Sequence, residues 1–405
     1  MLLWSAGCFG YILLRPSSVI TIAEIISPIL VCASVVLFLN KLATSESRSG
    51  KIAIFLFFAI AVSSLLGVTQ TLSGSYVGAS NPYLYGLSFY TASLAYHFKI
   101  KHNISLSDLF KISNPLLLAT GPVALFVRSI RHNSFKRRLN YYLPFVLVGV
   151  FYYQIIGSPL TELFYLITEV DLVSSLCFAI IFELFVYANF CGLSLIIFGV
   201  FGIFGYRVPL NFKQPFSSSN VVEFWRGWHL SLSMVLKVLF YAPARKKHSV
   251  YVAITTVYLA SALWHGITLN FLLWGCFHAI IFSVSVYSLK QGFKTFPFVL
   301  LPIGIVLGRL IFADTDTDRL MEKLLFSFDG FAVFDSIMSA RNTTKVSLLI
   351  GFIMIFIEFA FQKHSLVSKR NYKFLRIPAA LVCICSISIL FVSSGGIDFA
   401  VYGQR

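Results

Sequence analysis

Residues 172–204 read LVSSLCFAIIFELFVYANFCGLSLIIFGVFGIF, and this stretch decides the fold. It is longer than the ~20 apolar residues with which an α-helix crosses about 30 Å of hydrocarbon. A backbone in hydrocarbon must satisfy its own hydrogen bonds, which a helix does and a loose segment does not. The sequence therefore predicts a membrane-spanning helix here.

The composition of the whole chain fits the same environment. Hydrophobic residues make up 58% and charged residues 12% of the 405 residues, whereas soluble domains carry about 25% charged residues. A water-soluble globule is therefore excluded. Further apolar runs lie at 19–40, 52–71, 141–157, 250–263, 271–289, 296–312, 345–362 and 377–395, with shorter or interrupted ones at 2–14, 83–96 and 112–127. We predict an all-α integral membrane protein with roughly ten transmembrane helices, in which residues 1–405 form a single polytopic domain.

Two of the shorter runs are candidates for re-entrant structure. Residues 2–14 are too short for a comfortable span and lack a signal-peptide cleavage pattern, so they form either a shortened first helix or a re-entrant one. Residues 112–127 are broken by Pro115, Gly121 and Pro122, with basic connections on both sides. A re-entrant, broken helix satisfies both constraints if protein or a water-filled cavity shelters it; a proline-kinked span is the alternative.

The net charge of +16 is explained by topology rather than by nucleic-acid binding. Acidic residues gather at 162–171 and 314–335. Basic residues cluster in the connections at 41–51, 99–111, 128–138, 226–247, 290–294 and 363–376. Placing the basic connections in the cytoplasm gives a consistent alternation of spans. The seven cysteines fall in apolar segments and are expected to pack as small hydrophobic side chains, and no metal site is expected.

Residues 205–248 carry most of the chemistry. An extended loop is expected at 205–216, followed by a helix with Asn220 as N-cap and Glu223 at the capping-box position. Helical spacing continues from Val221 through His229, so one helix is expected across this stretch. Its basic residues place it at the cytoplasmic interface, where they suit either an anionic ligand, such as the phosphates of a nucleotide-linked donor, or lipid headgroups.

Two histidines, each beside a tryptophan, stand out in this apolar chain. His229 follows Trp228, and His265 follows Trp264 in a segment that joins two helices. An ionisable side chain at membrane depth is costly and marks a functional site by default, and imidazole suits proton transfer near neutral pH. A packed core histidine is the alternative for each. His278 lies too far along its helix to share a site with His265 by helical spacing, and a structural role is expected for it.

These segments resemble the membrane-bound O-acyltransferase family, in particular the bacterial branch that acylates alginate and teichoic acid. The resemblance rests on an ordered series of motifs across residues 83–318. They are GLSFYT at 86–91, ATGP at 119–122, PLNFKQP at 209–215, FWRGWHLSLS at 224–233, LWHG at 263–266, LLWG at 272–275 and LIFA at 310–313. The ordered series is far more specific than any single motif.

The resemblance implies a ring of helices around a central tunnel. It implies that His265 is the catalytic histidine and that His229 lies toward the cytoplasmic entrance. An acyl thioester donor, acetyl-CoA or an acyl carrier protein, enters from the cytoplasm, and no cofactor is permanently bound. The hydroxyl acceptor, an envelope glycan or glycolipid, arrives from outside. His265 takes the hydroxyl proton and returns it to the thiolate.

The chain departs from the family pattern where carboxylates are usual. The relatives carry Trp-x-Arg-Asp-Tyr where this chain reads MVLKVLFY at 234–241, and Asp-Phe-Ser-Gly-Tyr-Ser-Asp where it reads NFCGLSL at 189–195. A third aspartate is replaced near His97 or Lys99. The histidines remain, so the reaction is expected to be kept while contacts with donor, acceptor or partner have changed.

The sequence leads to one hypothesis and two alternatives. The hypothesis is an inner-membrane O-acyltransferase that moves a short acyl group, acetyl or similar and conceivably D-alanyl, and works with an extracellular acyl-handling partner. Trp264 and Trp228 are expected to line the tunnel, Arg226 to contact the donor, and Ser231 or Asn270 to orient an imidazole. The alternatives are a transporter or flippase, against which no internal repeat is seen, and a catalytically inactive scaffold of an envelope-modification complex.

Overall fold

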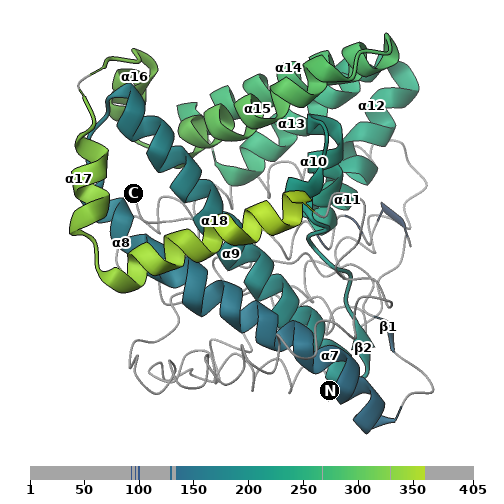
Figure 1. Cartoon of the computed structure of the whole chain (residues 1–405). Coiled ribbons are helices and arrows are strands. Elements are labelled where there is room, and N and C mark those ends of the chain that lie inside the picture. Colours follow the sequence, from purple (N-terminus) through teal and green to yellow (C-terminus); the bar gives the residue numbers. More distant parts are fainter. Residues whose placement is uncertain are drawn as a thin grey trace, which may run out of the picture.

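The computed structural model describes Ser93, Tyr96, Lys99, Ile100 and residues 128–129, 134–266, 268–328 and 330–360. The predicted spans at 19–40, 52–71 and 377–395 and the runs at 2–14 and 112–127 lie outside these residues, as does 83–96 apart from Ser93 and Tyr96. The described part is almost entirely helical (Figure 1).

Within the described residues, five helical stretches are long and apolar enough to cross a membrane. The first runs from Phe135 to Leu166 through α7 (Phe135–Val150), the π-helix η2 (Phe151–Gly157) and α8 (Ser158–Leu166). The others are α9 (Leu172–Ile203), α14 (Leu269–Lys290), α15 (Thr295–Ala313) and α18 (Asn342–Ala360). A shorter apolar helix, α13, runs from Val250 to His265. Helices long and apolar enough to span are thus confirmed for the predictions at 141–157, 172–204, 271–289, 296–312 and 345–362, whereas the helix at the predicted span 250–263 is shorter.

The predicted bounds at 141–157 are wrong at both ends. The helix begins at Phe135, includes Pro144 and passes through Gly157 and Pro159 without stopping. Gly157 fits because a Cβ there would lie 2.7 Å from the amide of Asn189, so glycine permits the close contact with α9. Pro159 lies inside this continuous stretch and has no N–H to donate, and the Ile155 carbonyl four residues before it accepts the Ser347 hydroxyl instead.

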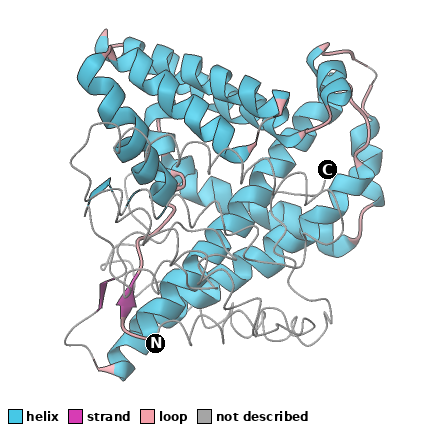
Figure 2. Cartoon of the chain, turned by 180° about the vertical axis from the view of Figure 1, so that it is seen from behind, coloured by secondary structure: helices cyan, strands magenta, loops and turns pink. Residues whose placement is uncertain are grey.

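Helix α9 is the central element of the described fold. It crosses the middle of the molecule, with α7 alongside it in both views (Figures 1 and 2). Its most apolar part is 89% buried, against 22% for α18. A helix that is apolar on all sides belongs in the interior, whereas the exposed side chains of α18 suit contact with lipid. Glycines permit the α7–α9 approach, because a Cβ on Gly149 would lie 2.6 Å from the Gly192 carbonyl oxygen.

The two predicted acidic connections meet at one end of the molecule. The Leu172 N–H donates to Ser327 O at 2.7 Å, and Arg319 Nη2 donates to Thr168 O at 3.1 Å. Helices α16 (Thr317–Leu324) and α17 (Ala332–Ser339) lie at this end (Figure 1). The other end of α9 lies by the start of α7, where Arg138 Nε donates to Ile203 O at 3.0 Å. There the strands β1 (Arg128–Ser129) and β2 (Tyr206–Arg207) pair antiparallel.

Short helices connect β2 to α13 and carry the first histidine motif. They are the 3-10 helix η3 (Pro215–Ser217), α10 (Val221–Gly227), α11 (Leu230–Leu236), the π-helix η4 (Lys237–Tyr241) and α12 (Ala242–Lys247). They lie beside the α13–α15 layer (Figure 1). The extended loop predicted at 205–216 is confirmed over residues 208–214, whereas β2 and η3 occupy parts of its two ends.

Candidate active site

The helical conformation is interrupted between α10 and α11, and His229 lies at this interruption. Trp228 is extended, and His229 adopts the left-handed conformation (φ 43°, ψ 57°). The expectation of one continuous helix through His229 is therefore wrong. Left-handed backbone costs an L-residue about 1–2 kcal/mol, and such strain clusters at functional sites.

Asn211 in the preceding loop accounts for the break. Its carbonyl oxygen accepts the Leu230 N–H at 2.9 Å, and its Oδ1 accepts the Ser231 N–H at 3.1 Å and the Ser231 hydroxyl at 2.8 Å. These bonds satisfy N–H groups at the start of α11 that a continuous helix would have paired internally. On the other side of the break, the Ser233 hydroxyl donates to Trp228 O at 3.3 Å.

Glu358 of α18 holds η3, which follows this loop directly. Its Oε1 accepts the Phe216 N–H at 2.8 Å, and its Oε2 accepts the Tyr187 hydroxyl at 2.6 Å. Glu358 is buried. The sequence reasoning missed this residue, although an isolated acid in the apolar run 345–362 was a signal for it. Glu358 thus ties α9 and α18 to the loop that positions His229.

The start of α10 follows the prediction with one difference. Asn220 caps the helix by accepting the Glu223 N–H at 3.0 Å. The Glu223 carboxylate reaches back to the N–H and hydroxyl of Ser219, at 3.0 and 2.8 Å, rather than to the Asn220 N–H. Burial raises the pKa of the Glu223 carboxyl, but the hydrogen bonds from Ser219 and Asn220 and the charge of Arg226 outweigh it, so that this pKa is lowered.

His265 is positioned by packing against aromatic side chains, whereas hydrogen bonds fix the backbone at His229. It is the last residue of α13, and the Gly266 N–H bonds to Ala262 O at 3.0 Å. The predicted junction between two helices is confirmed, since α14 begins at Leu269. Four aromatic rings surround the imidazole, with centroid separations of 4.9 Å to Trp264, 4.9 Å to Phe312, 5.5 Å to Trp274 and 5.8 Å to Phe271.

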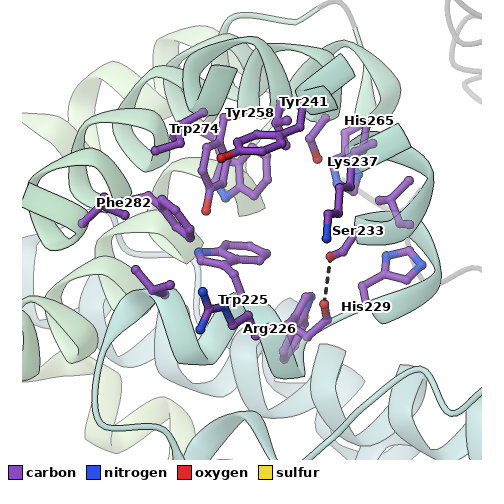
Figure 3. A pocket seen from close by; sticks show the side chains of 18 of the residues that line it. Trp225, Arg226, His229, Ser233, Lys237, Tyr241, Tyr258, His265, Trp274 and Phe282 are labelled. Atoms are coloured by element: carbon purple, nitrogen blue, oxygen red, sulfur yellow. Dashed lines mark hydrogen bonds between the residues drawn. The ribbon is translucent and has the colours of Figure 1, made fainter. Parts of the chain in front are cut away.

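Both histidines line one cavity of about 500 Å³. Figure 3 shows His229, Ser233, Lys237 and His265 along one wall, with Phe282 on the opposite side. Trp264 does not line the cavity, yet its ring lies 6.1 Å from the His229 ring and 4.9 Å from the His265 ring, and so it packs against both. Two histidines from separate motifs, together with aromatic walls, give a space in which an imidazole can exchange a proton with a bound molecule.

The other residues singled out by sequence divide into two groups. Trp228 and Arg226 line the cavity, whereas Ser231 and Asn270 do not. Ser231 bonds to Asn211, as described above, and Asn270 Nδ2 donates to Phe312 O at 3.0 Å. These two side chains therefore fasten backbone at the two junctions, and neither bonds to an imidazole through these contacts.

His278 lies closer to the site than helical spacing indicated. Its ring stacks on Tyr258 at 5.8 Å and meets the ring of Trp225 at 5.1 Å and that of Trp274 at 4.9 Å. Trp274 in turn contacts His265. His278 does not line the cavity, so it supports the cavity wall from behind.

The structure adds a buried ion pair that the sequence reasoning missed. Arg309 of α15 lines the cavity, and its Nε pairs with Glu183 of α9. Each stands alone as a charged residue in its long apolar helix, which was the available signal. Within the described ranges, no group of three His, Cys, Asp or Glu residues is arranged to hold a metal ion.

Parts of this chain are similar to one protein-family model and to several bacterial proteins. Residues 112–299 match the model of MBOAT, the membrane-bound O-acyltransferase family. The chain is 35% identical over 102 residues to a peptidoglycan O-acetyltransferase of Helicobacter pylori, covering 24% of this chain and 19% of that protein. It is 31% identical over 174 residues to a probable alginate O-acetylase of Pseudomonas syringae pv. tomato, covering 40% and 34%.

A third relative is the teichoic acid D-alanyltransferase of Bacillus subtilis, 25% identical over 164 residues, with 37% of this chain and 42% of that protein covered. The chain thus spans less than half the length of these curated relatives. The family match includes both histidines and the loop that carries Asn211. Over residues 112–299, this chain is thus similar to the membrane-bound O-acyltransferase family.

Proposed function

We propose that the protein is a membrane O-acyltransferase that moves a short acyl group, acetyl or similar, from a cytoplasmic thioester to a hydroxyl of a cell-envelope glycan or glycolipid. The observation that carries this proposal is the shared cavity, which His229 and His265 line together. The names of the relatives support it, since all three act on envelope polymers.

In this proposal His265 is the general base. The acceptor hydroxyl gives its proton to the imidazole as its oxygen attacks the thioester carbonyl carbon. The tetrahedral intermediate then collapses, the C–S bond breaks, and the thiolate takes the proton back from the imidazolium. The four rings leave His265 only partly exposed, and in this proposal such an apolar wall limits the access of water and so protects the thioester from hydrolysis.

The donor enters from the basic side. Lys237 and Arg226 line the cavity and are exposed, and Arg245, Lys246 and Lys247 follow on α12. We place this side in the cytoplasm of a cell that carries the protein in its inner membrane. The phosphates of acetyl-CoA, or the acidic surface of an acyl carrier protein, suit these cations. The acceptor, and any extracellular partner, then approach from the acidic end.

Mass spectrometry of envelope glycans and lipids tests the proposal. Cells produce the wild type, His265→Ala, His229→Ala or His248→Ala, at equal amounts of protein in the membrane. His248 is the matched control, because it is an exposed histidine that does not line the cavity. We expect an ester-linked mass with the wild type and His248→Ala, and its loss with His265→Ala. Identical ester profiles in all four strains would overturn the proposed activity.

A further inference from the structure

Arg309 is a buried cation beside the proposed reaction centre. It is 8% exposed and is the single charged residue of α15. Two other cations, Arg226 and Lys237, line the same cavity, but both are exposed. Among the described residues, Arg309 is therefore the one cation that reaches the buried part of the cavity wall.

The contacts of Arg309 place it between the two histidine motifs. Its Cζ lies 5.3 Å from the centroid of the Trp228 ring and 5.3 Å from that of Phe312. Trp228 precedes His229 in the chain, and the Phe312 ring lies 4.9 Å from the His265 ring. Aromatic faces hold a guanidinium in a fixed plane, so its orientation is set by the residue that precedes His229 and by a ring that packs on His265.

Glu183 engages only one of the five N–H donors of this guanidinium. The ion pair runs through Nε, and no hydrogen bond joins the terminal nitrogens to a described residue. A buried ion pair is costly unless its remaining donors find acceptors. The N–H groups on the terminal nitrogens belong to a side chain that lines the cavity. They therefore point to a hydrogen-bond acceptor that arrives with the substrate.

We propose that Arg309 is a further catalytic residue of the acyl transfer and that Glu183 positions it; this inference rests on the proposed function. When the acceptor oxygen attacks, the carbonyl π electrons move onto the carbonyl oxygen, and the terminal N–H groups of Arg309 donate to this oxyanion. Its charge returns to the carbonyl as the C–S bond breaks. Glu183 neutralises the net charge of the guanidinium, so the stabilisation comes from oriented donors already in place before the reaction.

Kinetics on membranes containing each variant test this role. Acetyl-CoA is the donor probe, the isolated envelope glycan is the acceptor, and ester formation is followed at varied concentrations of both. We expect Arg309→Met to lower kcat about 10²–10³-fold, the usual loss when one oxyanion donor is removed, with little change in KM. Arg309→Lys should retain part of the rate, and added guanidinium should raise the rate of Arg309→Ala. Glu183→Gln should lower kcat less than Arg309→Met.

Lys323→Met is the matched control. Lys323 is also buried, at 2% exposed, and pairs with Asp314 at 2.8 Å, but it does not line the cavity. An unchanged kcat with Arg309→Met, or equal losses with Lys323→Met and no effect of guanidinium, would overturn the role of Arg309. A raised KM for the glycan at unchanged kcat would instead make Arg309 an acceptor-binding group. Activity of His265→Ala equal to wild type, or no transfer by any variant, would overturn the proposed function itself.

Discussion

His229 and His265 line one cavity but are held there by opposite means. His229 depends on hydrogen bonds from a distant loop, with Asn211 fastened to α11 and Glu358 fastened to the loop. His265 ends a regular helix and depends on the packing of four rings. Polar networks fail abruptly when one partner is lost, whereas packed rings respond to changes in volume. The two sides of the site are therefore expected to respond to different substitutions.

Glu358→Leu is expected to have the largest effect on stability. It leaves the buried Tyr187 hydroxyl and the Phe216 N–H without their acceptor, and each loss costs ~1–3 kcal/mol. Thermal unfolding in detergent should show a destabilisation of about 2–6 kcal/mol, together with loss of acyl transfer. Glu358→Gln keeps one acceptor oxygen and should cost less. Equal stability of the Leu variant and the wild type would show that Glu358 does not hold the loop.

Gly275→Ala is the corresponding change on the His265 side. A Cβ there would lie 2.7 Å from the Ala262 Cβ and 3.0 Å from Tyr258 O, so it would push α14 from α13. We expect a destabilisation of about 1–3 kcal/mol. Gly304→Ala is the control, because its nearest contact is the Ile281 side chain at 3.3 Å. Both variants gain about 1 kcal/mol of helix propensity, so the difference between them measures packing, and no difference would contradict the close approach.

The same contrast explains what the sequence could predict. The positions of α9, α14 and α15 follow from composition, because a long apolar run in a membrane protein has no other stable structure. The ends of the α7–α8 stretch do not follow, since glycine and proline usually interrupt a helix, whereas here Pro144 lies inside α7 and Gly157 is retained within the helix by its close contact with Asn189. Local signals thus predict elements better than their bounds.

For the site, the motifs identified both histidines but not what holds them. The break at His229 arises from Asn211, which is distant in sequence, and helical spacing through Trp228 pointed the other way. The pairing of Arg309 with Glu183 joins two helices. A lone charge in an apolar run marks such a residue as functional, but only the fold identifies its partner.

The difference in stability between the glycine and alanine variants should have opposite signs at the two histidines. Both His229→Gly and His229→Ala remove the imidazole, but glycine adopts the left-handed conformation without strain, so His229→Gly should be more stable than His229→Ala by about 0.5–1 kcal/mol. At His265 the backbone is helical, and His265→Gly should be less stable than His265→Ala by up to about 1 kcal/mol. Unfolding midpoints of the four variants measure both differences. The same sign at both positions would refute the strained backbone at His229.

Glu223 gives the smallest effect and brings pH into the comparison. Its pKa is lowered in the folded protein, because hydrogen bonds to the charged carboxylate outweigh its burial. The ionised form is therefore the stabilising one. Its contribution is fully present above the unfolded pKa of about 4.3 and is lost as pH falls through the lowered pKa. The Tm of the wild type should exceed that of Glu223→Gln at neutral pH, and the difference in Tm should close below about pH 4.3.

Glu223 lies at the start of α10, on the His229 side of the site. The four rings around His265 should therefore be unaffected, and the fluorescence emission of Trp264 and Trp274 should not follow this titration. A difference in Tm that widens on acidification would mean that the neutral carboxyl is the form bound by Ser219.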